Sequence, residues 1–459
     1  MNNILCVYLV IVISLFTAEI NAEHHRKPNC SVQAYTQFPD DIFTQTQRRC
    51  GFVVIHIAIA FYMFIALAKI CDDYFVPSLE SICTKLHVPP DVAGATFMAA
   101  GSSAPELFTS IIAVFVVKDD IGLGTIVGSA VFNIFCIIAL CAIFAKSVIQ
   151  LNWYPLMRDC TYYILTIFVM IIVLYDGRVI WIEGLGFILL YCGYITIMYY
   201  NSLIEETIHK LLGSSTSFTD NHIEVIRLIE DAEDDPKSTI NGNLTNEEEL
   251  SKVEIQDIDT STKSRIIKWA KLSLTPIDLI LRYTVPDCRE DTKKNAYMLT
   301  FILSIVWIAL FSYVLVWMMT LIGYTFGVPD TIMGLTVLAA GTSVPDALTS
   351  ILVAKSGYSD MAVSNSIGSN IFDILLCLGV PWFIRSLYSP VYIFSEGLTY
   401  TSVTLLSSVV LTLGIVACNK WVLNKRLGVI FFIVYTLFIL LACLIEMNVF
   451  GNVSLPSCL

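Results

Sequence analysis

Apolar residues in this chain are gathered into runs that are long enough to cross a lipid bilayer as helices. The hydrocarbon core of a bilayer is about 30 Å thick, so a spanning helix needs roughly 20 predominantly apolar residues. The composition fits this pattern, because 56% of the 459 residues are hydrophobic and only 14% are charged. Soluble domains carry about 25% charged residues, so we expect an all-α, multi-pass membrane protein.

Ten candidate spans follow the first 51 residues, five on each side of a long polar stretch. They cover approximately 52–70, 88–117, 121–145, 160–174, 179–200, 297–321, 331–354, 361–384, 398–417 and 427–447. The fourth run is the shortest of the ten. The sequence therefore predicts a first transmembrane repeat at 52–200, an acidic loop at 201–296 and a second transmembrane repeat at 297–447.

The N-terminus has the pattern of a secretory signal peptide. Residues 4–16 form an apolar run that is too short to span a bilayer comfortably, and small residues follow up to Ala22. We expect residues 1–22 to be cleaved, the alternative being a short signal anchor that stays attached. Asn29 begins an Asn-Cys-Ser glycosylation sequence, so we expect the segment 23–51 to be extracellular.

The distribution of basic residues predicts the same orientation. With the mature N-terminus outside, eight Lys or Arg residues fall in short cytoplasmic loops and three in external loops, as the positive-inside bias requires. The loop 201–296 is then cytoplasmic, and the tail 448–459 is extracellular. Residues 201–260 hold 15 acidic and four basic residues, which is typical of a solvated, disordered tract and lacks the ligand spacing of an EF-hand.

A short motif occurs twice in the chain at a fixed offset of 240 residues. The segment Ala-Ala-Gly-Ser-Ser-Ala-Pro-Glu, ending at Glu106, aligns with Ala-Ala-Gly-Thr-Ser-Val-Pro-Asp, ending at Asp346. The same register pairs Gly-Ser-Ala-Val-Phe-Asn, ending at Asn133, with Gly-Ser-Asn-Ile-Phe-Asp, ending at Asp373. One register over so many glycine and polar positions predicts an internal structural repeat.

The two copies of the motif are expected to enter the membrane from opposite sides. The first copy lies in spans two and three and the second in spans seven and eight, so corresponding helices are an odd number of spans apart. Inverted repeats of this kind are typical of secondary transporters, whose substrate site lies near the bilayer midplane between the copies. We therefore expect two inverted-topology repeats of five helices each.

Each copy carries the groups that a hard cation needs. A carboxylate at mid-membrane is costly unless it has a partner, so Glu106 and Asp346 are functional candidates. Pro105 and Pro345 precede them and should interrupt the helix, which frees backbone carbonyls one turn earlier. Carboxylates, hydroxyls and carbonyls are the ligands that Ca²⁺ prefers, whereas soft metals need clustered histidine or cysteine ligands that the motifs lack.

Close helix packing is the structural alternative for the small residues of the motif. It would explain four glycines, namely Gly94, Gly128, Gly334 and Gly368. It does not explain the acidic residues inside the spans. Three further acids lie at the expected external ends of spans, where we expect solvated loop charges: Asp119, Asp120 and Asp330.

One polar position differs between the two copies. Asn133 in the first copy corresponds to Asp373 in the second, so the expected site holds three carboxylates. Two carboxylates would neutralise Ca²⁺. The third could take up an additional monovalent cation or a proton.

The segments 95–144 and 331–382, which carry these motifs, closely resemble the calcium/cation antiporter superfamily and, within it, the potassium-dependent sodium/calcium exchangers. The resemblance implies that Na⁺ moves inward while Ca²⁺ and K⁺ move outward. It implies that Glu106 and Asp346 bind Ca²⁺ and Na⁺, and that Asp373 confers the dependence on K⁺. The neighbouring positions that match ligands in the family are Ser102, Ser103, Ser129, Asn133, Thr342, Ser343 and Ser369.

Other functions remain open on the sequence. A K⁺-independent Na⁺/Ca²⁺ exchanger or a Ca²⁺/H⁺ exchanger would use the same acidic residues, a passive channel would need a continuous pore, and an intramembrane protease would need paired aspartates. We expect no enzymatic activity, no cofactor apart from the transported ions and no nucleic-acid partner. We expect the protein to lie among the lipids of the plasma membrane, with an intracellular organelle membrane as the alternative.

Overall fold

The computed structural model describes residues 34–86, 99–144, 149–201, 276–289, 296–355, 359–393 and 397–447, and the single residues 204, 395 and 449. The expected signal peptide, Asn29, most of the acidic loop and nearly all of the C-terminal tail lie outside the described residues. Contacts divide the chain into two units, Met1–Tyr199 with Thr284–Leu459, and Tyr200–Tyr283. The second unit is described chiefly by a helical segment at 276–283, and the elements named below all belong to the first.

Nine helical stretches among the described residues are long and apolar enough to cross a membrane. They are Gln45–Leu86, Ile121–Phe144, Trp153–Tyr175, Trp181–Tyr199, Tyr297–Phe326, Asp330–Ile351, Ala362–Ser386, Gly397–Cys418 and Lys425–Glu446. Each overlaps one of the runs expected from the sequence. The remaining run, 88–117, is described only from Ala99 and contains the shorter apolar helix Ala104–Val117. The fourth span is longer than the expected 160–174, because it begins at Trp153 and has 23 residues.

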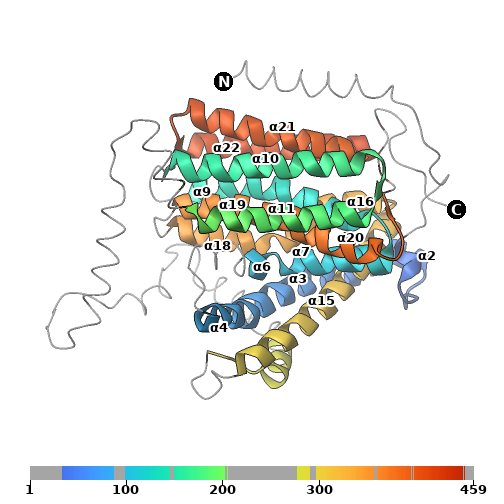
Figure 1. Cartoon of the computed structure of the whole chain (residues 1–459). Helices are drawn as coiled ribbons and strands as arrows, with labels where there is room; N and C mark the ends of the chain where they lie inside the picture. The colour runs from blue at the N-terminus through green and yellow to red at the C-terminus, as the bar shows by residue number, and fades with distance from the viewer. Residues whose placement is uncertain are drawn as a thin grey trace, which may run out of the picture. The chain divides into compact units, whose positions relative to one another are not determined.

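Within the described part of the chain, five spans consist of successive helical segments and five are single helices, and Figure 1 labels the helices where there is room. In the first half they are α3 (Val53–Ile70), η3 (Cys71–Phe75), α4 (Val76–Leu86), α6 (Ala99–Ser102), α7 (Ala104–Ile112), η5 (Ala113–Val117), α8 (Ile121–Val131), η6 (Phe132–Ile137), α9 (Ile138–Phe144), α10 (Trp153–Tyr175) and α11 (Trp181–Tyr199). In the second half they are α15 (Tyr297–Phe326), α16 (Asp330–Met333), η9 (Gly334–Leu338), α17 (Ala339–Thr342), α18 (Val344–Lys355), α19 (Ser359–Phe372), η10 (Asp373–Leu378), α20 (Gly379–Ser386), α21 (Gly397–Cys418) and α22 (Lys425–Glu446). These η segments are π-helical turns, which occur frequently at functional sites.

The described part of the N-terminal segment is attached to the transmembrane helices. It contains η1 (Ala34–Gln37), α2 (Gln45–Gln47) and η2 (Arg48–Phe52). Tyr35 stacks on Tyr324 of α15 with ring centroids 3.9 Å apart, and Arg48 Nη1 lies 2.6 Å from Asp41 Oδ2. Burial alone would raise the pKa of Asp41, but hydrogen bonds from Arg48 and His56 outweigh it and hold that pKa below its ordinary value.

Two short β ribbons join the halves of the chain. β1 (Ile149–Gln150) pairs with β4 (Val422–Leu423), and β2 (Arg178–Val179) pairs with β3 (Val391–Tyr392), both antiparallel. Paired strands must lie on the same side of a membrane, and even numbers of the described spans separate them: six between β1 and β4, four between β2 and β3. A single span, α10, separates β1 from β2, so the two ribbons lie on opposite faces. Each ribbon joins a linker of one half to the other half, as inverted halves require.

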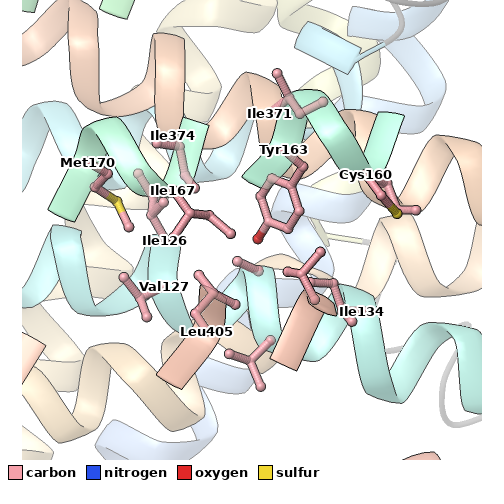
Figure 2. Packing of buried hydrophobic residues seen from close by; sticks show 14 of the residues in the cluster. Ile126, Val127, Ile134, Cys160, Tyr163, Ile167, Met170, Ile371, Ile374 and Leu405 are labelled. Carbon is pink, nitrogen blue, oxygen red and sulfur yellow. The ribbon is translucent and has the colours of Figure 1, made fainter. Parts of the chain in front are cut away.

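The centre of the first unit is built from α8, α10, η10 and α21. Tyr163, Ile126, Ile167 and Leu405 are fully buried there, and their side chains meet in one cluster (Figure 2). Within the span Ile121–Phe144, 83% of the most apolar stretch is buried. The corresponding share in Gln45–Leu86 is 28%, which leaves much of α3 free to face lipid. The motif helix α8 therefore occupies the interior, where a polar site can be shielded.

Two glycines of the repeat allow α8 to cross η9 at backbone contact. A methyl group added at Gly128 would lie 2.2 Å from the Leu335 carbonyl oxygen, and one at Gly334 would lie 2.4 Å from the Ile121 carbonyl oxygen. The packing role expected for these two glycines is confirmed. The same expectation is wrong for Gly368, where an added methyl would meet only the Tyr194 hydroxyl, at the ordinary distance of 3.6 Å. Gly94 lies outside the described residues.

Gly128→Ala is expected to prevent correct assembly of the protein. The added methyl would have to displace backbone rather than a flexible side chain, which is the most costly kind of overpacking. The measurement is the yield of monodisperse protein after detergent extraction, together with its thermal midpoint. Gly414→Ala is the matched control, because no described atom beyond its own helix backbone lies within 4 Å of the added methyl; equal behaviour of the two variants would contradict the close crossing.

Candidate cation site

The motif helix is interrupted at the same place in both copies. α6 ends at Ser102 and α7 begins at Ala104, and the residue between them, Ser103, has φ −93° and ψ 12°. Ser343 separates α17 from α18 with φ −84° and ψ 3°. Proline follows two residues after each break and cannot donate a hydrogen bond to the carbonyl four residues before it. Each break therefore presents backbone oxygens and hydroxyls beside the following carboxylate.

The three acidic candidates are almost completely removed from the surface. Glu106 is 1% exposed, Asp346 is 2% exposed and Asp373 is 0% exposed. Their charges interact with one another. Among the described residues, none of the three is paired with lysine, arginine or histidine. Buried carboxylates without a cationic partner are costly, so the site favours binding of positive charge.

Hydrogen bonds join the two copies across this site. The hydroxyls of Ser129 and Ser343 are 2.7 Å apart, and Ser343 Oγ donates to Glu106 Oε1 at 3.5 Å. Asn133 Nδ2 donates to Ser369 Oγ at 3.3 Å. Each of these bonds links a residue of one half to a residue of the other, so the cluster lies between the two repeats.

The remaining candidates belong to the same cluster. The carboxyl group of Asp346 interacts with the side chains of Ser102, Ser369 and Asn133, and that of Glu106 interacts with Thr342. The structure thus brings together all ten residues selected from the sequence as ligands: Ser102, Ser103, Glu106, Ser129, Asn133, Thr342, Ser343, Asp346, Ser369 and Asp373.

Several oxygens of the cluster are buried and have no hydrogen-bond partner in the described ranges of the chain. They are Ser103 Oγ, Glu106 Oε2, Asn133 Oδ1, Asp346 Oδ1 and Asp373 Oδ2. A buried polar atom left unsatisfied costs about 1–3 kcal/mol, and more when it is charged. Oxygens of this kind gathered in one place are the ligand set of a hard cation.

Neutral oxygens would have to complete the coordination of any ion. Among the described residues, no group of three or more His, Cys, Asp or Glu side chains is arranged to hold a metal ion by itself. Hydroxyl, amide and backbone oxygens bind a cation less strongly than a shell of carboxylates. This suits transport, because an ion must bind well enough to enter a site and weakly enough to leave it.

Two further residues of the cluster were not selected from the sequence. Asn370 is fully buried, accepts a hydrogen bond from Asn133 Nδ2 at 2.9 Å and donates to the Ala130 carbonyl at 3.3 Å. Ser366 Oγ donates to the Asn133 carbonyl at 3.0 Å. Comparing the copies does not reveal them, since Asn370 corresponds to Ala130. The available signal was spacing, because Ser366, Asn370 and Asp373 recur at i, i+4 and i+7 on one helix face.

The acids at the expected external end are not all solvated. Asp120 is 5% exposed, and its Oδ2 accepts a hydrogen bond from the Ser395 backbone at 2.6 Å. Glu446 is also buried and accepts from Ser395 Oγ at 2.9 Å, while Asp330 is half-buried. Burial raises the pKa of Asp119 to about 6, aided by the charge of Glu446 and opposed by the Asp120 backbone hydrogen bond. The expectation of solvated loop charges is therefore wrong for Asp120.

Comparison with known proteins places the chain in a family. The model of the sodium/calcium exchanger protein family matches residues 56–200 and 296–444, which is more than half of the chain. Among solved structures, the sodium-calcium exchanger NCX_Mj is 21% identical to this chain, and the match covers 84% of this chain and 98% of NCX_Mj with a TM-score of 0.47.

The sequence relatives are much closer. Human sodium/potassium/calcium exchanger 4 is 38% identical over 96% of this chain and 89% of its own length. Human sodium/potassium/calcium exchanger 3 is 38% identical over 94% of this chain and 86% of its own. A probable sodium/potassium/calcium exchanger of Drosophila melanogaster is 35% identical over 94% of this chain and 86% of its own length. Identity at this level along nearly the whole length shows that the chain belongs to the sodium/potassium/calcium exchanger family.

Proposed function

We propose that the protein is a secondary active antiporter that moves Na⁺ inward in exchange for Ca²⁺ together with K⁺ moving outward. The observation that carries this proposal is the cluster of unpartnered, buried oxygens between the two inverted motif copies. The relatives named above are exchangers of sodium, potassium and calcium by name, and their similarity supports the choice of ions.

The charges of the cluster support Ca²⁺ and K⁺ as joint cargo. Glu106, Asp346 and Asp373 supply three negative charges when ionised, and one Ca²⁺ with one K⁺ supplies three positive charges. Na⁺ would occupy the same oxygens in the opposite half of the cycle, because it also prefers hard oxygen ligands. We assign Ser102, Ser103, Ser129, Asn133, Thr342, Ser343 and Ser369 as neutral ligands.

Alternating access follows from the inverted repeats. When two copies of one structure face opposite sides of the membrane, exchange of their conformations closes the site to one side and opens it to the other. The site residues come from both copies, so any movement between the copies alters the whole ligand set. We propose that Pro105 and Pro345 serve this process by keeping the helix interrupted at Ser103 and Ser343.

Calcium flux measured with and without potassium tests the proposal. Cells expressing the protein are loaded with Na⁺, external Na⁺ is then replaced by choline, and ⁴⁵Ca²⁺ uptake is followed with K⁺ or Li⁺ outside. Uptake is expected only with K⁺. Equal uptake in the two solutions would favour the alternative, a K⁺-independent Na⁺/Ca²⁺ exchanger, and uptake driven by a pH gradient alone would favour a Ca²⁺/H⁺ exchanger.

A channel is distinguished by energetics. A channel lets Ca²⁺ run only down its own gradient, whereas an exchanger can move Ca²⁺ uphill at the expense of the Na⁺ gradient. Sealed vesicles with more Ca²⁺ inside than outside should still accumulate Ca²⁺ when the interior holds Na⁺ and external K⁺ is present. Failure of uphill uptake would contradict antiport.

The position of the chain in the cell is also proposed. We propose cleavage of residues 1–22, an extracellular segment 23–51 glycosylated at Asn29, a cytoplasmic loop 201–296, an extracellular tail 448–459 and residence in the plasma membrane. The basic residues of the short loops support this orientation. The orientation is tested by treating the protein with a glycosidase, because Asn29→Gln should lose the shift in apparent mass that the treatment causes in the unsubstituted protein. The location is tested by surface biotinylation, and protein confined to an organelle membrane would contradict it.

A further inference from the structure

Two serines that the site does not use occupy equivalent positions in the two copies. Ser110 and Ser350 each follow the carboxylate of their copy, Glu106 or Asp346, by four residues. Both serines are 1% exposed, and neither hydroxyl has a hydrogen-bond partner among the residues that the structure describes. The coincidence of position, burial and missing partner in both copies points to a shared role.

Buried helical hydroxyls in this protein are usually bonded to their own helix. Thr125 Oγ1 donates to the Ile121 carbonyl at 2.7 Å, and Ser402 Oγ donates to the Leu398 carbonyl at 2.7 Å. Thr109, the neighbour of Ser110, bonds in the same way. A buried hydroxyl without such a bond is destabilising. Each of the two serine hydroxyls is therefore available to a ligand that is bound during only part of the transport cycle.

Helix geometry places each serine next to its carboxylate along the path of an ion. Residues four apart lie on one helix face and are separated by about 6 Å along the axis. In the expected topology α7 runs outward, so Ser110 lies on the external side of Glu106. Since the copies are inverted, α18 runs inward, and Ser350 lies on the cytoplasmic side of Asp346.

A cavity reaches Ser110 from the expected external face. It has a volume of about 200 Å³, and the loop between η5 and α8 and the end of α20 contribute to its wall. The polar residues that line it are Ser110, Lys118, Asp119, Asp120, Arg385 and Tyr392. A cavity of this size holds about six waters, so a cation could keep much of its hydration shell as far as Ser110.

We propose that Ser110 and Ser350 are threshold ligands, which bind the alkali or alkaline-earth cation transiently between water and the carboxylate site. Ser110 serves entry and exit on the external side, and Ser350 serves the cytoplasmic side. The proposal rests on the exchange function proposed above. The proposal adds one consequence to that function: each serine is needed only for ions that enter or leave on its own side of the membrane.

The test is a comparison of Ser110→Ala with Ser350→Ala on the two sides of the membrane. External Ca²⁺ is titrated in Na⁺-loaded cells, and cytoplasmic Ca²⁺ is titrated as exchange current in inside-out patches, with saturating K⁺ throughout. Ser110→Ala is expected to raise the half-saturating external Ca²⁺ about three- to tenfold and to leave the cytoplasmic value unchanged. Ser350→Ala is expected to do the reverse.

Ser312→Ala is the matched control. Ser312 of α15 is also fully buried and has no hydrogen-bond partner among the described side chains and backbone, but its helix carries no acidic residue. It should change neither half-saturating concentration. If Ser110→Ala does not reach the cell surface, Asp119→Asn replaces it, because Asp119 lines the same cavity. Asp119→Asn should raise only the half-saturating external Ca²⁺ concentration. The control for this variant is Asp40→Asn, since Asp40 is exposed.

Two results would overturn the proposal while exchange itself continues normally. One is an unchanged external value in Ser110→Ala. The other is a rise on one side matched by an equal fall on the other, because that pattern marks a shift between inward-facing and outward-facing states. Absence of Na⁺-driven Ca²⁺ flux in the unsubstituted protein would instead remove the proposed function, and the threshold role with it.

Discussion

Glu106→Gln and Asp346→Asn are each expected to abolish Na⁺-driven Ca²⁺ transport while the protein still reaches the cell surface. Each amide keeps the shape of the side chain and removes one negative charge from a site that lacks a basic partner among the described residues. Removing one partner of a buried charge pair costs about 3 kcal/mol or more, which is at least roughly 100-fold in ion affinity. The fold should tolerate the change, because the unoccupied site then holds one unpaired charge fewer.

The measurements are ⁴⁵Ca²⁺ uptake and surface biotinylation of the same cells. Asp176→Asn is the matched control, since this carboxylate is 47% exposed and pairs with Arg178 in a linker, so its loss should leave uptake unchanged. Robust uptake by either site variant would show that the buried carboxylates do not ligate the transported ion.

Asp373→Asn is expected to remove the requirement for K⁺ without abolishing exchange of Na⁺ for Ca²⁺. The substitution makes the second copy match Asn133 of the first and leaves two carboxylates, whose charge one Ca²⁺ balances. Asp373 is fully buried, and its Oδ2 has no hydrogen-bond partner within the part of the chain that the structure describes. The variant and the unsubstituted protein are compared for Ca²⁺ uptake in K⁺ and in Li⁺.

The ratio of the two uptake rates is the informative quantity. In the unsubstituted protein uptake in Li⁺ should be near background, and in Asp373→Asn it should approach the rate in K⁺. A variant that still depends strictly on K⁺ would place the K⁺ ligand elsewhere in the cluster, and a variant inactive in both solutions would make Asp373 a ligand of Ca²⁺ as well.

The sequence predicted the spans well because membrane helices need long apolar runs whatever their neighbours are. It predicted which polar residues lie together, because two copies of one motif mark the same positions twice; that they bind the ion stays a prediction. The sequence failed to predict a site residue where the corresponding position of the other copy is not polar. Asn370 corresponds to Ala130, so the repeat concealed it, although its side-chain Oδ1 accepts a hydrogen bond from Asn133 Nδ2.

Features that depend on tertiary contacts were not predictable. The burial of Asp120 depends on the Ser395 backbone, which lies 275 residues away in the sequence. The π-helical turn that begins at Asp373 packs against α7 and against α11, and propensity alone does not favour such turns. The ribbons are two residues per strand, too short to leave an alternating pattern.

Those ribbons bear on how such a protein could have arisen. β1 and β3 occupy the same linker in their respective halves, as do β2 and β4, and each ribbon pairs one strand of each kind. Two identical five-span chains inserted in opposite orientations would therefore form both ribbons without any new contact. A homodimer of two identical chains in opposite orientations would have this geometry. A protein encoded by a fusion of the two gene copies would keep it. The unequal copies, with Asn133 of the first corresponding to Asp373 of the second, then record a specialisation that arose after the two copies could change separately, because identical subunits cannot differ at one position.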